Sequence, residues 1–360
     1  MTNNFLVSIR CYTFNQARYI KQTLDGFVMQ QTTFPFVITL VDDASTDGEQ
    51  DVILQYIEDH FSTQDTSVYE AKETDFAHII FAQHKNNRNC CIATLLLKEN
   101  HFSQNKDKLG YLQEWRESAK YEAFCEGDDY WTDEKKLQRQ VDYMEAHPKC
   151  GLCYTDCDIF YESEDRWEKS IFESGLQERF NDENPILPRM GWYTSNVTWV
   201  WRMSVYNKIP QNHGYKDRPL YTLLSICLLS KLAYIPYSTG IYRRYVGSVS
   251  YDEDKKKKFA YYSNSFFLFD HFIPKFPDAK NVKRMFYDNR LFGTFAQALE
   301  YGDKDIVKAY KDFYPWWFMI VAEKEVRNRR ANVTKPLSLP YRIVRRLLFM
   351  YRRLAMFFRH

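Results

Sequence analysis

The stretch VDDASTDGEQ, residues 41–50, places acidic and hydroxyl side chains directly after an apolar run. The preceding residues 37–41, VITLV, predict a buried strand because β-branched side chains predominate. Apolar residues at helical spacing follow the turn, at Val52, Ile53, Tyr56 and Ile57. A strand that ends in Asp42 and Asp43 and leads into a helix indicates an α/β fold.

The residues before this turn predict another strand and helix. FLVSIRCYTF, residues 5–14, predicts a strand, and residues 15–31 carry apolar side chains at helical spacing, with Asn15 as the expected N-cap. Strand, helix, strand and helix in this order predict a mostly parallel sheet with right-handed crossovers. Such sheets bind ligands beyond the carboxyl ends of their strands, so Asp42 and Asp43 should face a ligand crevice.

Further elements follow along the chain. We expect strands at 77–87, 150–161 and 192–202, and a strand that runs into an acidic turn at 120–131. We also expect helices at 106–119, 132–147 and 218–232, and a strand pair or a strand and turn at 233–245. The helix at 132–147 should start at an N-cap, Thr132 or Asp133, and end before Pro148. Polar segments at 62–76 and 160–190 predict an exposed insertion and a loop over the crevice.

Beyond about residue 250 only helices are expected. The predicted organisation is therefore a catalytic domain at 1–250, a helical extension at 251–330 and a basic amphipathic helical tail at 331–360.

Composition limits the classes of protein that fit this chain of 360 residues. Its formal net charge of +2 excludes a strongly basic nucleic-acid binder. The eight cysteines form no disulfide framework and predict reduced thiols in a cytoplasmic chain. The apolar runs at 220–230 and 313–322 fall short of the roughly 20 residues of a spanning helix, and the N-terminal run is too short for a signal peptide.

A second acidic turn, CEGDDYW at residues 125–131, follows another predicted strand. Glu126, Asp128 and Asp129 repel one another there unless a cation neutralises them, and hard oxygen ligands suit Mg²⁺ or Mn²⁺. A divalent ion held by few carboxylates commonly completes its shell with substrate phosphates. Two such turns at strand ends of one sheet therefore indicate a site for a nucleotide diphosphate.

Three segments together resemble the family 2 glycosyltransferases, in particular those of bacterial surface-polysaccharide synthesis. They are VSIRCYTFNQARYI (7–20), VDDASTDG (41–48) and FCEGDDYWTDEKKLQRQVDYME (124–145). The resemblance spans roughly residues 5–250 and implies a GT-A fold, a Rossmann-like, mostly parallel sheet flanked by helices. It also implies inverting transfer of a sugar from a nucleotide diphosphate, most commonly UDP, to an acceptor.

The resemblance further implies which residues hold the donor. Asp43 is expected to accept a hydrogen bond from the ring N–H of the base, with Asp42 beside it. The other implied nucleotide-binding residues are Tyr12, Thr13, Phe14, Asn15, Glu126, Gly127, Arg243 and Arg244. The two arginines could pair with phosphate oxygens, and the alternative is that both are surface residues.

The implied metal ligands are Asp128, the counterpart of the last Asp in the family's Asp-x-Asp motif, and Glu126. Glu126 replaces the usual first Asp and is longer by one methylene, which makes its direct contact less secure. Tyr245 stands where the family frequently has a His, so the third protein contact to the ion is open.

An inverting transfer needs one carboxylate to take the proton of the acceptor hydroxyl. Asp217, just before the predicted helix at 218–232, is the expected base, and the alternative is that it is only the N-cap of that helix. Trp192, Thr194 and Asn196 are the expected sugar and acceptor contacts, although a buried core strand also explains this segment.

The C-terminal tail combines basic and apolar residues with no acid. The basic residues are Arg342, Arg345, Arg346, Arg352, Arg353 and Arg359. Such a helix is expected in a membrane interface, on the inner face of the cell membrane, where the acceptor would be a lipid-linked saccharide. The alternative is an amphipathic helix packed on the protein itself or on a partner.

Two other functions are compatible with parts of this pattern. A sugar-phosphate nucleotidyltransferase needs a glycine-rich loop after the first strand, and CYTFNQARY, residues 11–19, contains no glycine. A catalytically silent glycan-binding or scaffolding protein with a GT-A body, docked on the membrane, stays open as the alternative.

Overall fold

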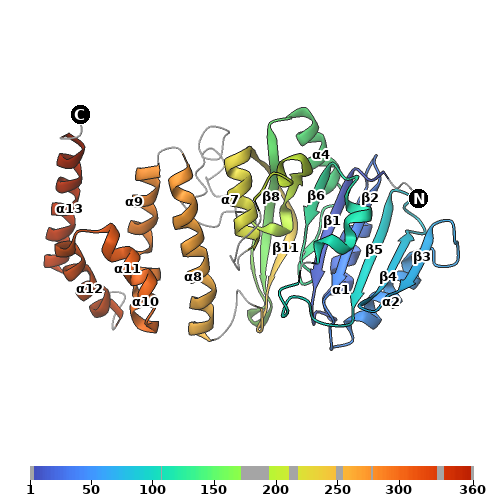
Figure 1. Ribbon diagram of the computed structural model, residues 1–360, viewed down its shortest axis with the longest axis horizontal. Coiled ribbons are helices and arrows are strands. Elements are labelled where there is room, and N and C mark those ends of the chain that lie inside the picture. The colour runs from blue at the N-terminus through green and yellow to red at the C-terminus, as the bar shows by residue number, and fades with distance from the viewer. Residues whose placement is uncertain are drawn as a thin grey trace. The chain divides into compact units, whose positions relative to one another are not determined.

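One mixed sheet organises the first of the two units into which the chain divides, Met1–Tyr251 and Asp252–His360 (Figure 1). The structure is a computed structural model that describes residues 4–106, 108–171, 194–210, 218–248, 254–276, 279–330 and 336–357. Among these residues the sheet has 11 strands in the order β3-β4-β5-β2-β1-β6-β10-β8-β11-β7, and β9 pairs with β8.

The strands are β1 (Val7–Thr13), β2 (Phe36–Asp42), β3 (Tyr69–Glu73), β4 (Ala77–Gln83), β5 (Cys90–Leu97), β6 (Tyr121–Phe124), β7 (Tyr130–Trp131), β8 (Cys150–Tyr161), β9 (Arg166–Glu168), β10 (Val200–Arg202) and β11 (Lys231–Arg244). The α-helices of this unit are α1 (Ile20–Val28), α2 (Glu49–His60), α3 (Gln113–Arg116), α4 (Lys136–Ala146), α6 (Met203–Tyr206) and α7 (Arg218–Leu229). Short 3-10 helices are η1 (Leu109–Leu112), η2 (Glu162–Glu164) and η4 (Asn196–Thr198).

The centre of the sheet is parallel. β1 pairs in parallel with β2 and β6, and β2 pairs in parallel with β5. Their carboxyl ends therefore meet at one edge, to which Thr13, Asp42 and Phe124 belong. β10 is antiparallel to both β6 and β8, so β8 also runs in the direction of the central strands. This arrangement confirms the predicted α/β class, with antiparallel strands added.

Both faces of the central strands are covered, which explains why β2 is buried along its whole length. Along β1, Ile9 and Cys11 belong to the large core cluster that includes residues of α1, α2 and α4. Arg10, between them, pairs on the opposite side with the buried Glu122 of β6. The alternation places apolar side chains under one layer of helices and an ionic contact on the other face.

Three strands were missed in the sequence, and one of them is β9, which lies in the segment 160–190 that was expected to be a loop. Residues 90–97, CCIATLLL, form β5, which is fully buried between β2 and β4 and shows no alternation of polar and apolar residues. The expected exposed insertion at 62–76 contains β3, which pairs antiparallel with β4. The helix expected at 106–119 is only η1 followed by the single turn of α3. Of the strand expected at 192–202, the described residues 194–202 form only the short η4 and β10.

The predicted N-cap role of Asn15 is wrong. α1 begins at Ile20, with Tyr19 as its cap residue. Asn15 has a positive φ of 55°, and its Oδ1 accepts a hydrogen bond from the Thr46 N–H at 2.8 Å. Its side chain thus joins the end of β1 to the acidic turn after β2.

The expected start of α4 is also too early, although its end is correct. α4 begins at Lys136, and Asp133 Oδ1 accepts a hydrogen bond from the Lys135 N–H at 2.9 Å just before it. The helix ends at Ala146, before Pro148, as predicted.

The second unit contains only helices among its described residues, which confirms a helical C-terminal extension. They include α8 (Lys255–Phe272), α9 (Ala279–Arg290), α10 (Ala296–Tyr301), α11 (Lys304–Phe313), α12 (Trp316–Arg330) and α13 (Leu339–Phe357), with η6 (Ile273–Lys275) and the π-helical η7 (Leu291–Phe295). Aromatic rings of Phe266, Tyr287 and Tyr310 contact one another in its core. No described helix has the length and apolar character needed to cross a membrane.

Candidate nucleotide and metal site

Three carboxylates meet in the turn between β6 and β7. One oxygen from each of Glu126, Asp128 and Asp129 lies within 4.8 Å of the others. The Gly127 N–H donates to the Tyr12 carbonyl at 3.0 Å, which holds the turn against the end of β1. The cluster therefore lies at the carboxyl edge of the parallel strands, where the sequence predicts a metal site.

Asp129 is the most deeply buried member, with 1% of its surface exposed. Its Oδ1 accepts a hydrogen bond from the Arg243 N–H at 2.9 Å, whereas the buried Oδ2 has no hydrogen-bond partner. Burial and the neighbouring charge of Asp128 hold the pKa of Asp129 well above its ordinary value. Burial also raises the pKa of Asp128. A partnerless buried oxygen among hard oxygen donors fits a divalent cation.

Arg243 lies against this turn and is only 8% exposed, so it is not a surface residue. Its Nε donates to the Asp128 carbonyl at 2.9 Å, and its guanidinium lies 4.3 Å from the ring centre of Tyr19. Arg244, the next residue of β11, instead donates to the Tyr161 hydroxyl at 3.4 Å. Of the two predicted arginines, the structure brings Arg243 to the acidic cluster.

Tyr245 occupies the position at which the resembled family often has a histidine. Its hydroxyl donates a hydrogen bond to the Asp128 carboxylate, and its ring packs on Tyr19 with centroids 4.9 Å apart. Burial, followed by the charge of Asp128, raises the pKa of Tyr245. A neutral phenol therefore orients Asp128 here.

The backbone at Gly127 leaves no room for a side chain. A Cβ on Gly127 would lie 2.6 Å from Gln16 Oε1 and 2.7 Å from Thr13 Cβ. Thr13 in turn donates its hydroxyl to Glu49, and the Gln16 N–H donates to Glu49 Oε2 at 2.9 Å. Glu49 is fully buried, and burial raises its pKa. It was not predicted as a site residue, because its position in the first turn of α2 suggests an ordinary helix end.

Asp42 and Asp43 are buried at the end of β2 and bind different partners. Asp42 accepts from Gln50 Nε2 at 2.5 Å and from the Ser45 N–H at 3.1 Å, so it fixes its own turn. The Asp43 N–H donates to the Thr13 carbonyl at 3.1 Å. The acidic turns of Asp43 and Gly127 therefore flank the same end of β1.

The Asp43 carboxylate is engaged by the segment that follows β5. It accepts from the backbone N–H groups of His101 at 2.8 Å and Phe102 at 3.0 Å, and from Lys108 Nζ at 2.6 Å. Lys108 Nζ also lies 5.1 Å from the ring centre of Tyr12. Lys108 was missed because nothing in the spacing of NKDKLG links it to residue 43.

The remaining predicted residues lie around these turns or outside the described part. Phe14 is 44% exposed beside Asn15. Asn196 Nδ2 donates to Glu126 Oε2 at 3.3 Å, which brings η4 to the acidic cluster. Thr194 is buried and its Oγ1 accepts from Trp199 Nε1 at 3.0 Å. Trp192 and Asp217 lie outside the described residues.

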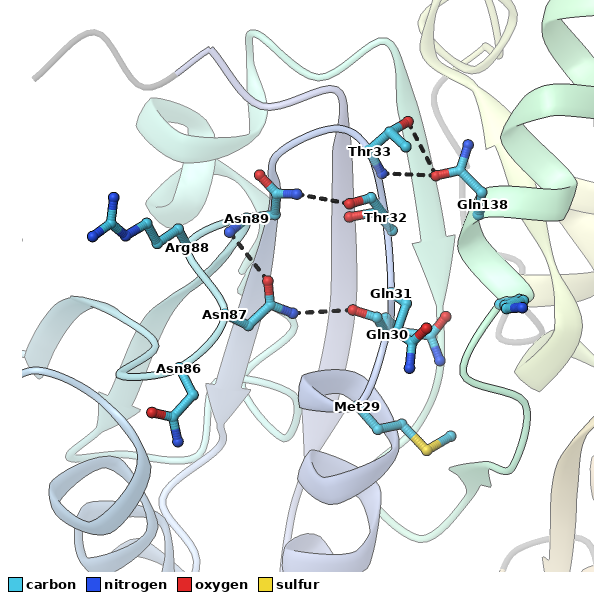
Figure 2. Close-up of a pocket in the computed structure, with 11 residues that line it drawn as sticks. Met29, Gln30, Gln31, Thr32, Thr33, Asn86, Asn87, Arg88, Asn89 and Gln138 are labelled. Carbon is cyan, nitrogen blue, oxygen red and sulfur yellow. Dashed lines mark hydrogen bonds between the residues drawn. The ribbon is translucent and has the colours of Figure 1, made fainter.

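A separate hollow of about 560 Å³ lies at the amino ends of β2 and β5 (Figure 2). Figure 2 shows its amide side chains reaching across to the neighbouring loop: Asn87 Nδ2 donates to the Gln30 carbonyl at 3.0 Å and Asn89 Nδ2 to the Thr32 carbonyl at 2.7 Å. These amides bind the protein's own backbone, and the hollow is at the opposite edge from the acidic cluster. It does not contribute to the candidate site.

No protein-family model matches the chain. It is 29% identical over 243 residues to the uncharacterized protein Rv1520 of Mycobacterium tuberculosis and, equally, to the uncharacterized protein Mb1547 of Mycobacterium bovis. The match covers 68% of this chain and 60% of each relative, so the chain spans less than two thirds of their length.

Solved structures similar to this chain include two complexes with nucleotide ligands. The mannosyltransferase PcManGT from Pyrobaculum calidifontis, in complex with GDP-Man and Mn²⁺, is 14% identical with a TM-score of 0.50, covering 93% of this chain and 89% of that one. TarS of S. aureus in complex with UDP is 14% identical with a TM-score of 0.48, covering 81% of this chain and 74% of that one. The likeness to PcManGT shows that the fold is of the GT-A type.

Proposed function

We propose that the protein is a metal-dependent, inverting glycosyltransferase of the family 2 kind. It moves a sugar from a nucleotide diphosphate, with UDP expected, to a saccharide acceptor. The cluster of Glu126, Asp128 and Asp129 at the carboxyl edge of a GT-A sheet carries this proposal. The similar mannosyltransferase structure, which contains GDP-Man and Mn²⁺, supports it.

Asp128 and Glu126 would hold Mn²⁺ or Mg²⁺, and the partnerless Asp129 Oδ2 would be a further oxygen ligand. When bound, such an ion supplies charge stabilisation to the leaving diphosphate. Arg243 adds a fixed positive charge, because its guanidinium is held between the Asp128 carbonyl and the Tyr19 ring. Tyr245 keeps the Asp128 carboxylate oriented.

The nucleoside belongs at the other turn, next to the shared end of β1. Asp43 is the proposed contact to the ring N–H of the base, with Asp42 beside it. The other nucleoside contacts proposed there are Tyr12, Thr13, Phe14 and Asn15. The close approach of the two turns at β1 supports this placement, because a nucleoside diphosphate must reach from one to the other.

Asp217 is the proposed base that deprotonates the attacking hydroxyl in a single displacement. The proposed sugar and acceptor contacts are Trp192, Thr194 and Asn196. The hydrogen bond between Asn196 and Glu126 supports this assignment for Asn196, since it couples the acceptor side to the acidic turn.

The proposed acceptor is a lipid-linked saccharide in surface polysaccharide synthesis. That acceptor is confined to a membrane, so the enzyme would work as a peripheral protein on the inner face, attached through its C-terminal tail.

Thermal unfolding with UDP, GDP and dTDP, each with and without Mn²⁺, tests donor binding. We expect one nucleotide to stabilise the protein only when Mn²⁺ is present, by roughly 2.7 kcal/mol at a hundredfold excess over Kd. Absence of stabilisation by every pair would contradict the proposal and favour a silent glycan-binding or scaffolding protein.

Hydrolysis of a panel of nucleotide sugars tests the base. Asp217→Asn should lower the rate by about 10²- to 10⁴-fold. Asn is as good an N-cap as Asp, so this variant should unfold at the parent's temperature, whereas Asp217→Ala should also lose the stability due to a cap. A full rate in Asp217→Asn would remove Asp217 from catalysis.

A further inference from the structure

Helices α12 and α13 pack side by side in opposite directions. At the start of α13, the Ser338 N–H donates to Glu325 Oε1 at 3.1 Å, late in α12. Near the end of α13, the ring of Tyr351 contacts Trp317, at the start of α12, with centroids 6.1 Å apart. The two helices therefore form an antiparallel pair.

One side of α13 is buried by this packing. Tyr341 and Leu348, seven residues apart on one helix face, are 2% and 4% exposed. Tyr341 also contacts the ring of Phe318 on α12. Packing on the protein's own body, the alternative considered for the tail, therefore accounts for this side of the helix.

A second apolar row on α13 is exposed. Ile343, Leu347 and Met350 are 48%, 50% and 56% exposed, and their spacing of four and three residues places them on one side of the helix. The row lies away from Tyr341 and Leu348. Packing within the second unit therefore does not explain why this row is apolar.

α12 carries an exposed apolar pair of its own, Trp316 at 74% and Ile320 at 62%. Trp317 and Tyr351, whose rings touch, lie next to the exposed rows of their respective helices. These two rings meet where α12 and α13 adjoin. Because each exposed apolar row lies beside one of the two rings, both rows face the same side of the helix pair. We call this the α12–α13 surface, formed by Trp316, Ile320, Ile343, Leu347, Met350 and Tyr351.

The charges around this surface are positive. Lys324 and Arg327 of α12 and Arg342 and Arg346 of α13 are exposed. Glu323 is the acid nearest in sequence to Ile320, and its Oε1 is paired with Arg327 Nη2 at 2.8 Å. The sequence carries no acid between residue 326 and residue 360.

We propose that the α12–α13 surface docks on an anionic lipid membrane and lies in its interface. Exposed apolar side chains beside a row of cations suit a headgroup layer, in which each Lys or Arg near the surface contributes about tenfold or less in affinity. A second copy of the chain is disfavoured as the occupant, because a symmetric contact would set the positive border against itself. This inference deepens the membrane attachment proposed above by naming the surface that makes it, and it can hold or fail independently of the proposed sugar transfer.

Sedimentation of the full chain with lipid vesicles tests the proposal. We expect binding to vesicles of phosphatidylcholine with phosphatidylglycerol, weaker binding to phosphatidylcholine alone, and release by salt.

Leu347→Asn should weaken binding about tenfold or more, since it removes one apolar side chain from the interface. Arg342→Gln with Arg346→Gln should weaken binding to anionic vesicles only. Leu229→Asn, at a 45% exposed leucine of α7, is the matched control and should bind like the parent.

Circular dichroism of each variant checks that the helices are retained. The proposal is overturned if the parent binds no vesicles, or if the Leu347 and arginine variants bind like the parent. It is also overturned if the parent is a dimer that Leu347→Asn dissociates while vesicle binding is absent, because the surface would then serve a second copy.

Discussion

The buried Asp129 carboxylate destabilises the folded protein when no cation is bound to the acidic turn. Its partnerless oxygen is buried beside two further carboxylates. Asp129→Asn should therefore raise the metal-free free energy of unfolding by about 0.5 to 2 kcal/mol and remove stabilisation by Mn²⁺. Thermal unfolding with and without Mn²⁺ measures both effects, with the exposed Asp142→Asn as the control. A variant that is less stable without metal yet still responds to Mn²⁺ would contradict this account.

Gly127 is a second position at which one atom decides the geometry. Gly127→Ala places a methyl group against Thr13 and Gln16, which themselves bind Glu49. We expect a loss of about 1 to 3 kcal/mol in stability and a loss of Mn²⁺-dependent nucleotide binding. Gly110→Ala, where a Cβ meets nothing within 4 Å, should leave both unchanged. Equal behaviour of the two variants would show that the turn tolerates a side chain.

Site residues that are close in sequence could be predicted, and those joined only by folding could not. The EGDD turn presents Glu126 and Asp128 together because only Gly127 separates them in the sequence. Lys108 contacts Asp43 across 65 residues, and Tyr245, the residue after β11, contacts Asp128. No local pattern encodes such contacts, because they depend on which strands become neighbours in the sheet.

Between elements, a buried ionic contact joins β1, β6 and α3. Glu122 is fully buried between Arg10 and Arg116. Glu122→Gln leaves two buried cations without their anion and should cost about 3 to 5 kcal/mol in the free energy of unfolding. Glu145→Gln removes the exposed pair with Lys120 and should cost about 1 kcal/mol or less. Urea denaturation compares them, and similar losses would contradict the buried contact's role.

α4 carries a buried amine, Lys136, whose Nζ donates to Gln140 Oε1 at 2.7 Å and lies 4.3 Å from the Trp131 ring centre. Burial lowers its pKa from 10.5 to about 7. The unfolded chain therefore binds more protons above pH 7, and this group makes the free energy of unfolding rise with pH there. Lys136→Met should flatten the rise between about pH 7 and 9, measured by urea denaturation. An unchanged pH slope in the variant would contradict the burial of a neutral amine.

Among the elements, β5 shows why some of the fold escaped prediction. Its continuous apolar run fits a central strand equally with a buried helix, and only its pairing with β2 and β4 decides between them. β8 was predicted with its observed bounds because its apolar run is flanked by Pro148 and the polar loop.

At the scale of the whole molecule, the GT-A sheet could be predicted from the order of strands and helices in its first half. The helical unit could be predicted only as helices, because its aromatic core gives no spacing that specifies how they pack. The α12–α13 surface follows the same division: the sequence shows one amphipathic tail, whereas the structure shows which of its apolar sides is exposed.

The central claim is that the two acidic turns jointly bind a cation and a nucleotide diphosphate. Calorimetric titration of the stabilising nucleotide into the full chain, with and without Mn²⁺, tests it most directly, with its nucleoside as the ligand lacking phosphates. The account predicts tight binding of the diphosphate only with Mn²⁺, no metal effect for the nucleoside, and loss of the metal effect in Asp128→Asn. Equal affinity for the diphosphate without Mn²⁺, or an unaltered metal effect in Asp128→Asn, would contradict it.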